Sequence, residues 1–373
     1  MIRRKGAKSA ANAFSPTFGF RPKYIVGRDR EISEFMESLA DAPGHPNRAT
    51  FFIGQRGMGK TVLLLELAEL AREAGFIVVR VVAGKTMLDE IIEGIQIAGQ
   101  RLAEEKKNAV KSITAGAFGF SVGLTFTEDV RRNYGFSTKL SLLCEALAKR
   151  KKGVLFLIDE IRASTTEMRV FATTYQHLVG DGMNVAVAMA GLPNAISSVL
   201  NDKILTFLNR AHKVDLKPLA TADVSVCFAK ALRDLEVEFD AITLDAAARA
   251  TDGYPYLLQL VGYHMLKFLD LESKLTATIV DIAVMSSKRA LVSDVLLPCL
   301  NPLSAEDKRF LKAMATDSEE SRVSEISDRL QVGKSHTQTY RRRLMEAGLI
   351  HSSSRGALAF SIPYLGQYLR GEL

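Results

Sequence analysis

Gly54-Gln55-Arg56-Gly57-Met58-Gly59-Lys60-Thr61 is the stretch that decides the fold of this 373-residue chain. It fits the template GxxxxGK[ST], in which glycines allow backbone N–H groups to point at phosphate oxygens. Residues 50–53 before it are typical of a strand, and residues 62–74 after it have apolar side chains at helical spacing. The following helix presents its positive N-terminal end to the same anion. The stretch therefore predicts a phosphate-binding loop between a strand and a helix.

The residues of this loop have expected roles in binding ATP and Mg²⁺. Lys60 adds positive charge beside the β- and γ-phosphates, and the Thr61 hydroxyl coordinates the metal ion. The other contacts come from the backbone of the loop and of the first helical turn. The residues expected to hold the nucleotide here are Gly54, Gln55, Arg56, Gly57, Met58, Gly59, Lys60, Thr61 and Val62.

Two adjacent acids follow another apolar run, about 100 residues after the loop. Residues 154–158 are all of a buried type, so Asp159 and Glu160 are expected at the end of a strand. Asp159 is the second expected Mg²⁺ ligand, and Glu160 is expected to orient and polarise the attacking water. Adjacent acids alone usually indicate a solvated turn. The strand before them favours a hydrolase site, with Glu160 and Lys60 as catalytic residues.

Strand and helix patterns alternate through the first half of the chain, and Met87–Lys107 is helical in pattern. The apolar runs of strand length are 50–53, Ile77–Val82, 154–158 and 185–190. Their alternation with helices predicts an α/β fold with a doubly wound parallel sheet. Residues 113–126 are rich in glycine and predict a hairpin within an insert over 108–135. This insert is either a contact element for a partner or a loop without that role.

The net charge of +7 is concentrated near the N-terminus. Residues 1–30 hold eight Lys/Arg and one Asp, so the other residues are balanced in charge. Residues 1–22 lack apolar periodicity and predict a flexible basic arm. Two interpretations of this arm are open, because it can contact the phosphates of a nucleic acid or remain a solvated tail.

Cysteine and hydropathy patterns predict the compartment. Cys144, Cys227 and Cys299 lie far apart without CxxC spacing, as expected for free thiols in a reducing compartment. Residues 1–8 are basic but are not followed by the apolar core of a signal peptide. The longest uncharged stretch, residues 182–201, predicts a strand and a loop and not a membrane span. The expected location is the cytoplasm, with no membrane contact.

Tyr24-Ile25-Val26-Gly27-Arg28-Asp29-Arg30-Glu31 resembles the VGR-x-x-E box that opens the origin-recognition and archaeal-ATPase branches of AAA+ and STAND proteins. The resemblance continues at Ala190-Gly191-Leu192-Pro193, at Asn209-Arg210 and at Gly253-Tyr254-Pro255. It covers about residues 23–300. With the loop and the acid pair, these boxes imply an ATPase of that group.

The resemblance also implies a domain organisation and further nucleotide contacts. An ATPase core is expected over 23–215 and a helical lid over 216–300. In the family the opening box packs around the adenine, which assigns Val26 and Arg28 to the nucleotide site. The Gly-x-Pro element at the start of the lid helices lies beside the nucleotide, which assigns Pro255 to the same site.

Two departures from the family pattern bear on hydrolysis. The family has a polar sensor of the γ-phosphate at the end of the fourth strand, where this chain has Ala190 and Gly191, with Asn194 as a weak substitute. The lid has Gly253-Tyr254-Pro255-Tyr256 where initiators have an arginine. The resemblance therefore implies slow or partner-dependent hydrolysis.

Arg210 lies where the family has an arginine that acts on the ATP of a neighbouring subunit. Such an arginine stabilises charge on the transferred phosphoryl group, so Arg210 is a third candidate catalytic residue. This role implies a homo-oligomer. The other open interpretation is an ordinary surface arginine.

Residues 301–373 resemble a winged helix-turn-helix domain. Helical patterns at 304–315, Val323–Leu330 and 335–347 precede two short β-like runs that can pair as a wing. The candidate contacts with double-stranded DNA are Lys334, Ser335, Thr337, Gln338, Arg341 and Arg355. Tyr340 and Leu344 are expected to face the core of this domain.

The sequence thus predicts an ATP-dependent switch whose ATP or ADP state controls DNA binding. The charge of the last domain leaves an alternative open, since residues 302–373 hold eleven Lys/Arg and nine Asp/Glu. The alternative is a STAND-type signalling, scaffold or defence ATPase, in which the winged helix binds a protein effector.

Overall fold

A computed structural model describes residues 13–17, 19–107, 120–122, 124–162, 164–269 and 274–373 of the chain. The chain divides into two compact units. The first, here called the sheet unit, comprises Asp29–Gly54 and Leu63–Leu216. The second, here called the lid unit, comprises Met1–Arg28, Gln55–Val62 and Lys217–Leu373.

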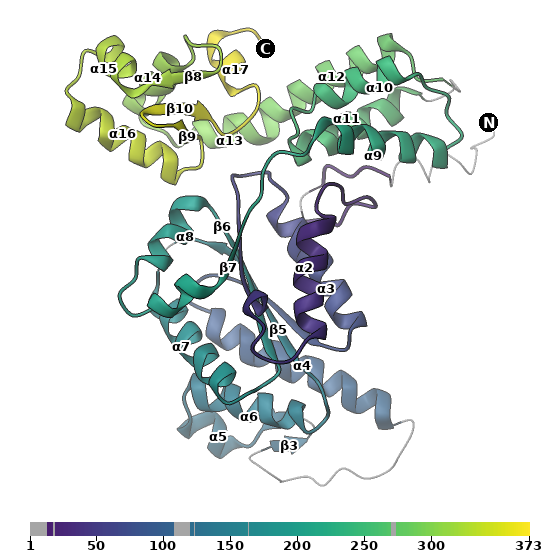
Figure 1. Ribbon diagram of the computed structural model, residues 1–373, viewed down its shortest axis with the longest axis vertical. Coiled ribbons are helices and arrows are strands. Elements are labelled where there is room, and N and C mark those ends of the chain that lie inside the picture. The colour runs from purple at the N-terminus through teal and green to yellow at the C-terminus, as the bar shows by residue number, and fades with distance from the viewer. Residues whose placement is uncertain (1–12, 18, 108–119, 123, 163, 270–273) are drawn as a thin grey trace. The chain divides into compact units, whose positions relative to one another are not determined.

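The sheet unit is built on a five-stranded parallel sheet with the strand order β2-β5-β6-β1-β7 (Figure 1). The predicted α/β fold with a parallel sheet is therefore confirmed. Four of the strands were expected from their apolar runs, and the edge strand β7 was not. The strands are β1 (Ala49–Ile53), β2 (Ile77–Val82), β5 (Val154–Ile161), β6 (Val185–Gly191) and β7 (His212–Asp215).

Helices cover both faces of this sheet. Phe52 of β1 packs against Phe35 of α2, with ring centroids 6.1 Å apart, whereas the neighbouring Phe51 belongs to a buried cluster with α4, α6 and α7. Because successive side chains of a strand point to opposite faces, both faces are apolar. The helices are α2 (Asp29–Ala40), α3 (Lys60–Glu73), α4 (Met87–Lys107), α5 (Glu128–Asn133), α6 (Phe136–Ala148), α7 (Thr166–Gly180) and α8 (Pro193–Leu200), with short 3₁₀ turns η1 (Pro46–Arg48) and η3 (Thr206–Arg210).

The insert carries the predicted hairpin, made of β3 (Phe120–Val122) and β4 (Thr125–Phe126). Residues 108–119 of the prediction lie outside the described residues. Leu124 packs on α4, because a β-carbon at Gly99 would lie 2.1 Å from its Cδ1. Gln96 of α4 donates a hydrogen bond to the carbonyl of Leu124 at 2.9 Å. The described end of the insert is thus fixed to α4.

Residues 216–300, where a helical lid is expected, are mostly helical in the lid unit (Figure 1). Part of the expected flexible arm is packed against it instead. Phe14 is 1% exposed, contacts Phe228 edge-on at 5.6 Å and fills the space beside Gly262. The lid comprises α9 (Thr221–Asp234), α10 (Ala241–Arg249), α11 (Pro255–Leu269), α12 (Ala277–Leu291), the π-helical turn η4 (Val292–Leu296) and α13 (Leu297–Leu300).

The last part of the lid unit, where a winged helix-turn-helix is expected, contains helices and a small antiparallel sheet. Three helices lie beside a three-stranded antiparallel sheet with the order β8-β10-β9. Ser304 begins the first helix through a capping box with Asp307, as its acidic first turn predicts. The elements are α14 (Ala305–Met314), β8 (Glu320–Arg322), α15 (Val323–Leu330), α16 (Lys334–Glu346), β9 (Ile350–Ser354), β10 (Ala357–Phe360) and α17 (Leu365–Arg370).

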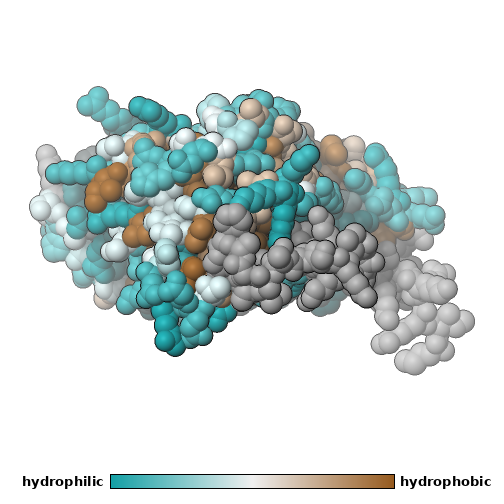
Figure 2. All heavy atoms as spheres, turned by 90° about the horizontal axis from the view of Figure 1, so that it is seen from below, coloured by the Kyte–Doolittle hydropathy of each residue, from teal (hydrophilic) through white to brown (hydrophobic). Residues whose placement is uncertain are grey.

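Within the described residues, no helix has both the length and the apolar composition that crossing a bilayer requires. On the face shown in Figure 2, hydrophobic side chains are scattered among hydrophilic ones. Single exposed apolar side chains of this kind are normal on a folded protein.

Candidate functional site

The loop at 54–61 has the conformation that binding of phosphate through the backbone requires. Gly57 and Gly59 have φ angles of 75° and 80°, a left-handed region that glycine adopts without steric cost. Lys60 begins α3, and its Nζ donates a hydrogen bond to the carbonyl of Gln55 at 2.7 Å. The loop therefore follows β1 and precedes a helix, as predicted.

Within the lid unit, the loop is packed against Tyr254 and Pro255. A β-carbon at Gly57 would lie 2.0 Å from the Tyr254 hydroxyl, and one at Gly59 would lie 3.8 Å from Pro255. Tyr254 is 1% exposed, and burial raises the pKa of its hydroxyl, which is neutral at physiological pH. Pro255 was predicted at this site and Tyr254 was not, although its place directly before Pro255 was a usable signal.

The box at 24–31 is held against the start of the lid. Arg28 is 8% exposed and donates to the carbonyl of Lys217 at 2.7 Å. Gly27 has a φ of 61°, and a β-carbon at this position would lie 3.0 Å from Asp223 Oδ2. Val26 packs against the lid core. Arg28 thus orders the box through backbone contacts, which is compatible with the adenine-side role predicted for Val26 and Arg28.

Asp159 and Glu160 lie at the end of β5 and differ in exposure because the strand is irregular there. The register of β5 against β6 shifts between Ile158 and Ile161, and Glu160 has a φ of 53°. This irregularity leaves Asp159 only 7% exposed while Glu160 is exposed. The N–H of Glu160 donates to the Asp159 carboxylate at 2.8 Å.

The Glu160 carboxylate forms an ion pair with Arg162 at 3.0 Å. The two side chains are 52% and 81% exposed, so water screens the pair and its contribution to stability is small. Because so weak a contact is easily exchanged for water, it leaves Glu160 able to act on a water molecule. Arg162 was not predicted to contact this site, and an exposed residue two positions on gives no sequence signal.

The end of β1, after which the loop begins, and the end of β5 lie on either side of the end of β6. Gly191, the last residue of β6, is in register with Ile53 of β1 on one side and with Ile161 of β5 on the other. Its carbonyl also accepts a hydrogen bond from the N–H of Gly54 at 3.3 Å. The carboxyl ends of parallel strands are the usual position of a ligand in an open α/β sheet.

The end of β6 has no room for a polar sensor. A β-carbon at Gly191 would lie 2.9 Å from Ile196 Cδ1 and 3.0 Å from the carbonyl of Ile161. Ala190 before it is fully buried, and Asn194 is half-buried in the first turn of α8. The physical reason for the departure is therefore close packing between the ends of β5 and β6.

Arg210 ends the 3₁₀ turn η3 and is exposed. Within the described part of the chain, its guanidinium makes no hydrogen bond or ion pair with another residue. The turn itself is anchored, because Asn209 donates to the carbonyl of Leu200 at 3.1 Å. Lys213 donates to the carbonyl of Asn209 at 2.7 Å. An exposed arginine on an anchored turn is compatible with either interpretation of Arg210.

Helix α16 exposes part of the face predicted to contact DNA. Ser335 and Gln338 are exposed, and Arg341 is half-buried, with its Nη1 donating to Gln338 Oε1 at 3.2 Å. Arg355 is exposed in the turn that joins β9 to β10. Lys334 begins the helix, but its side chain lies outside the described residues.

The prediction that Thr337 contacts DNA is wrong, because this side chain is fully buried. Its hydroxyl donates to Ser327 Oγ at 3.1 Å and so joins α16 to α15. Leu344 faces the core as expected, whereas Tyr340 is half-exposed and stacks on His336 with centroids 5.0 Å apart. The exposed side chains of α16 that were not predicted are His336, Thr339, Arg342, Arg343 and Glu346.

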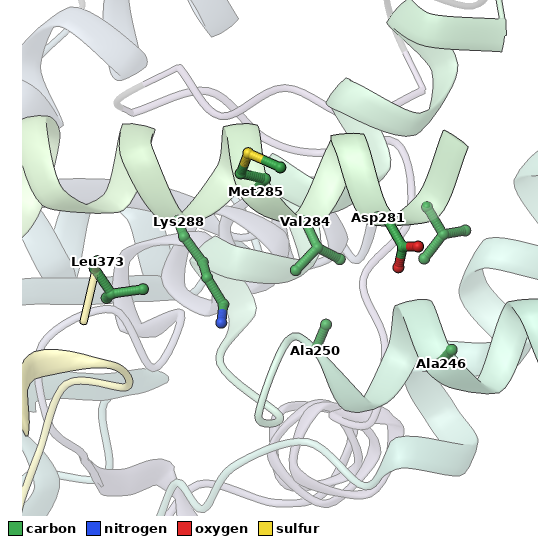
Figure 3. Close-up of a pocket in the computed structure, with 8 residues that line it drawn as sticks. Ala246, Ala250, Asp281, Val284, Met285, Lys288 and Leu373 are labelled. Carbon is green, nitrogen blue, oxygen red and sulfur yellow. The ribbon is translucent and has the colours of Figure 1, made fainter. Parts of the chain in front are cut away.

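The described residues contain no group of three or more His, Cys, Asp or Glu side chains that could hold a metal ion. A pocket of about 350 Å³ lies on the lid between α10 and α12 (Figure 3). Its lining includes none of the predicted site residues. It consists of Ala246, Ala250, Val280, Asp281, Val284, Met285, Lys288 and Leu373.

A glycine loop after β1 and an acid pair at the end of β5 define the class of P-loop ATPase folds. Among solved structures, the chain is similar to the Walker-type ATPase PABY2304 of Pyrococcus abyssi, with 16% identity, a TM-score of 0.67, and coverage of 93% of this chain and 96% of that chain. It is also similar to the ORC2 protein of Aeropyrum pernix in its ADPNP–ADP complexes, with 14% identity, a TM-score of 0.59 and coverage of 96% of each chain.

A third similar structure is Cdc6p from Pyrobaculum aerophilum, with 16% identity, a TM-score of 0.51 and coverage of 95% of each chain. Residues 294–369 match a family described as a domain of unknown function (DUF8462). A comparison with curated proteins found no match. The similar structures confirm the α/β P-loop fold, and the similarity extends over nearly the whole chain.

Proposed function

We propose that this protein is a Mg²⁺-dependent ATPase that acts as a nucleotide-controlled switch. The observation that carries the proposal is the position of Gly191, which is in register with the ends of both β1 and β5. The phosphate-binding loop and the acid pair therefore begin at one edge of the sheet. Glycines in the left-handed conformation and a buried carboxylate fit a magnesium–triphosphate ligand.

Different residues of the site have different roles in ATP hydrolysis. The loop N–H groups and Lys60 bind the phosphates, while Thr61 and Asp159 hold Mg²⁺. When bound, the metal ion neutralises charge on the phosphate oxygens. Glu160 orients the attacking water and accepts its proton. With no polar side chain at the end of β6, hydrolysis is slow unless a neighbouring copy supplies Arg210, so the working form is a homo-oligomer.

The nucleotide state controls binding of double-stranded DNA through α16 and the wing. The exposed face of α16 carries Gln338 and Arg342, residue types that bind base edges and phosphates, and Arg355 is at the tip of the wing. The basic residues of the N-terminal arm add positive charge for contacts with the phosphates. Cytoplasmic location, based on free cysteines, stays part of this proposal.

We expect two separable contributions to DNA binding: the charge of the N-terminal arm sets the dependence on salt, and side chains of α16 set the preference between DNA sites. Replacing Arg3, Arg4, Lys5 and Lys8 by Gln should lower the slope of log affinity against log salt by about 0.9 for each lost phosphate contact. Preference between sites should persist. Replacing Gln338 and Arg342 by Ala should instead reduce that preference, by about 1–3 kcal/mol for each lost bidentate base contact.

Fluorescence anisotropy on a selected duplex and a scrambled one, at several salt concentrations, measures both effects. Substitution is preferable to deletion of the arm because Phe14 is part of the lid core. Arg249→Ala, an equal charge change on the exposed side of α10, is the matched control and should leave the preference unchanged. If the full chain did not bind DNA at low salt, either with or without ATP, the DNA part of the proposal would be wrong.

A second candidate function is control of a protein effector by the same ATPase. The observation that favours it is the pairing of Arg343 with the buried Asp307 at 2.8 Å, which ties one arginine of α16 to its own domain. Together with the nearly balanced charge of residues 302–373, this lowers the attraction of the domain for phosphates. ATP-dependent binding of a protein with no DNA affinity would support this function.

A further inference from the structure

A buried carboxylate joins three segments of the sheet unit beyond the acid pair. The side chain of Asp202, just after α8, is 4% exposed. Its Oδ2 accepts hydrogen bonds from Ser164 Oγ and, at 2.8 Å, from Arg169 Nε, while its Oδ1 accepts from the N–H of Ile204 at 2.8 Å. Ser164 follows β5, Arg169 belongs to α7, and Ile204 lies in the turn before η3.

The segment from Asp202 to Arg210 is a continuous series of turns. The N–H of Leu205 donates to the carbonyl of Asp202 at 3.1 Å, and the N–H of Leu208 donates to the carbonyl of Leu205 at 2.9 Å. Leu205 and Leu208 are 0% and 3% exposed, so they fix these turns to the core. The position of Arg210 is therefore set by Asp202 together with these two leucines.

On the other side, Ser164 is four residues after Glu160 in the chain. A local turn at 202–204 needs only the bond from Ile204 to the carboxylate. The bonds from Ser164 and Arg169 come from other segments, and each charge-assisted bond fixes distance and direction. Asp202 thus connects the segment after the acid pair to the turn that carries Arg210.

We propose that Asp202 is a positioning residue that places Arg210 for hydrolysis, by fixing its turn to the segment that follows Glu160. This inference rests on the proposed ATPase function and on the role of Arg210 in it. Hydrogen bonds from Ser164, from the N–H of Ile204 and from Arg169 lower the pKa of Asp202 to about 2. The carboxylate is therefore ionised at every pH used for an ATPase assay.

The test compares turnover and nucleotide affinity in four variants: Asp202→Asn, Ser164→Ala, Arg210→Ala and Asp202→Asn with Arg210→Ala. Asp202→Asn should lower kcat by about tenfold to a hundredfold, the scale for a misplaced catalytic group, and leave the Kd of a non-hydrolysed ATP analogue within about twofold. Ser164→Ala removes one bond and should give a smaller loss in the same direction. It remains informative if Asp202→Asn does not fold.

Coupling between the substitutions distinguishes positioning from stability. If Asp202 acts through Arg210, Asp202→Asn should lower kcat by less than about twofold when Arg210 is already Ala. Adding Arg169→Gln to Asp202→Asn should restore part of the turnover, because the new amide can accept from the asparagine. Asp181→Asn, an exposed acid after α7, is the matched control.

Three results would overturn the inference: independent losses in the double variant, a full kcat for Asp202→Asn, or no effect of Arg210→Ala. Thermal unfolding of each variant identifies a loss that comes from stability alone. A parent protein that binds and hydrolyses no Mg-ATP would contradict the proposed function. If the parent hydrolyses Mg-ATP but the two substitutions lower kcat independently in the double variant, only the role of Asp202 is contradicted.

Discussion

The Glu160→Gln variant should keep the parent's affinity for ATP, but its rate of hydrolysis should fall by about 100- to 10,000-fold, because the water loses the base that orients it. The phosphate contacts of Lys60 and of the loop N–H groups are unchanged in this variant. Glutamine keeps the size of the side chain at a position where the backbone has a φ of 53°. Phosphate release under single turnover and equilibrium binding of a fluorescent ATP analogue measure the two effects separately.

Lys60→Ala is the contrasting variant, since it removes a charge that the phosphates contact in the bound state. It should lose nucleotide affinity itself, so its turnover should fall because little ATP is bound. Glu93→Gln, an exposed residue of α4, provides the matched control for loss of an acid and should behave like the parent. A Glu160→Gln protein with the parent's rate would show that another group orients the water.

The parallel strands could be predicted from the sequence because burial on both faces leaves a continuous apolar run. Residues 154–158 and Val185–Gly191 are such runs. The edge strand His212–Asp215 alternates between half-buried and exposed residues, and the short β8 (Glu320–Arg322) has polar ends. Neither has a local apolar signal, because pairing with a neighbouring strand decides their structure.

The candidate site shows the same division between local and tertiary causes. The loop at 54–61 and the acid pair could be read directly, since each has its chemistry within a few consecutive residues. Thr337 was misassigned because helical spacing alone does not say which polar residue bonds a neighbouring helix, here through Ser327. The place of Tyr254 directly before Pro255 indicated the site, but only the folded chain shows that its ring contacts Gly57.

Arg210→Ala should lower turnover by about a thousandfold, the scale for an arginine that completes the site of a neighbouring subunit. Nucleotide affinity of the isolated chain should change little, because Arg210 is exposed on η3 and acts on a different copy. For the same reason, the parent's activity per chain should rise with protein concentration until the oligomer is complete. Sedimentation and steady-state rates over the same concentration range would measure this correlation.

Mixing Arg210→Ala with Glu160→Gln should restore activity that neither variant has alone. In a mixed oligomer, some sites combine an intact Glu160 from one copy with an intact Arg210 from the next. With random head-to-tail assembly at equal amounts, about a quarter of the interfaces are of this kind, which limits recovery to about a quarter of the parent rate. Mixing Arg210→Ala with the double variant Arg210→Ala/Glu160→Gln creates no such interface and should recover nothing. Recovery in neither mixture, together with a rate per chain that ignores concentration, would mean that Arg210 is an ordinary surface residue and that each copy hydrolyses ATP with its own side chains.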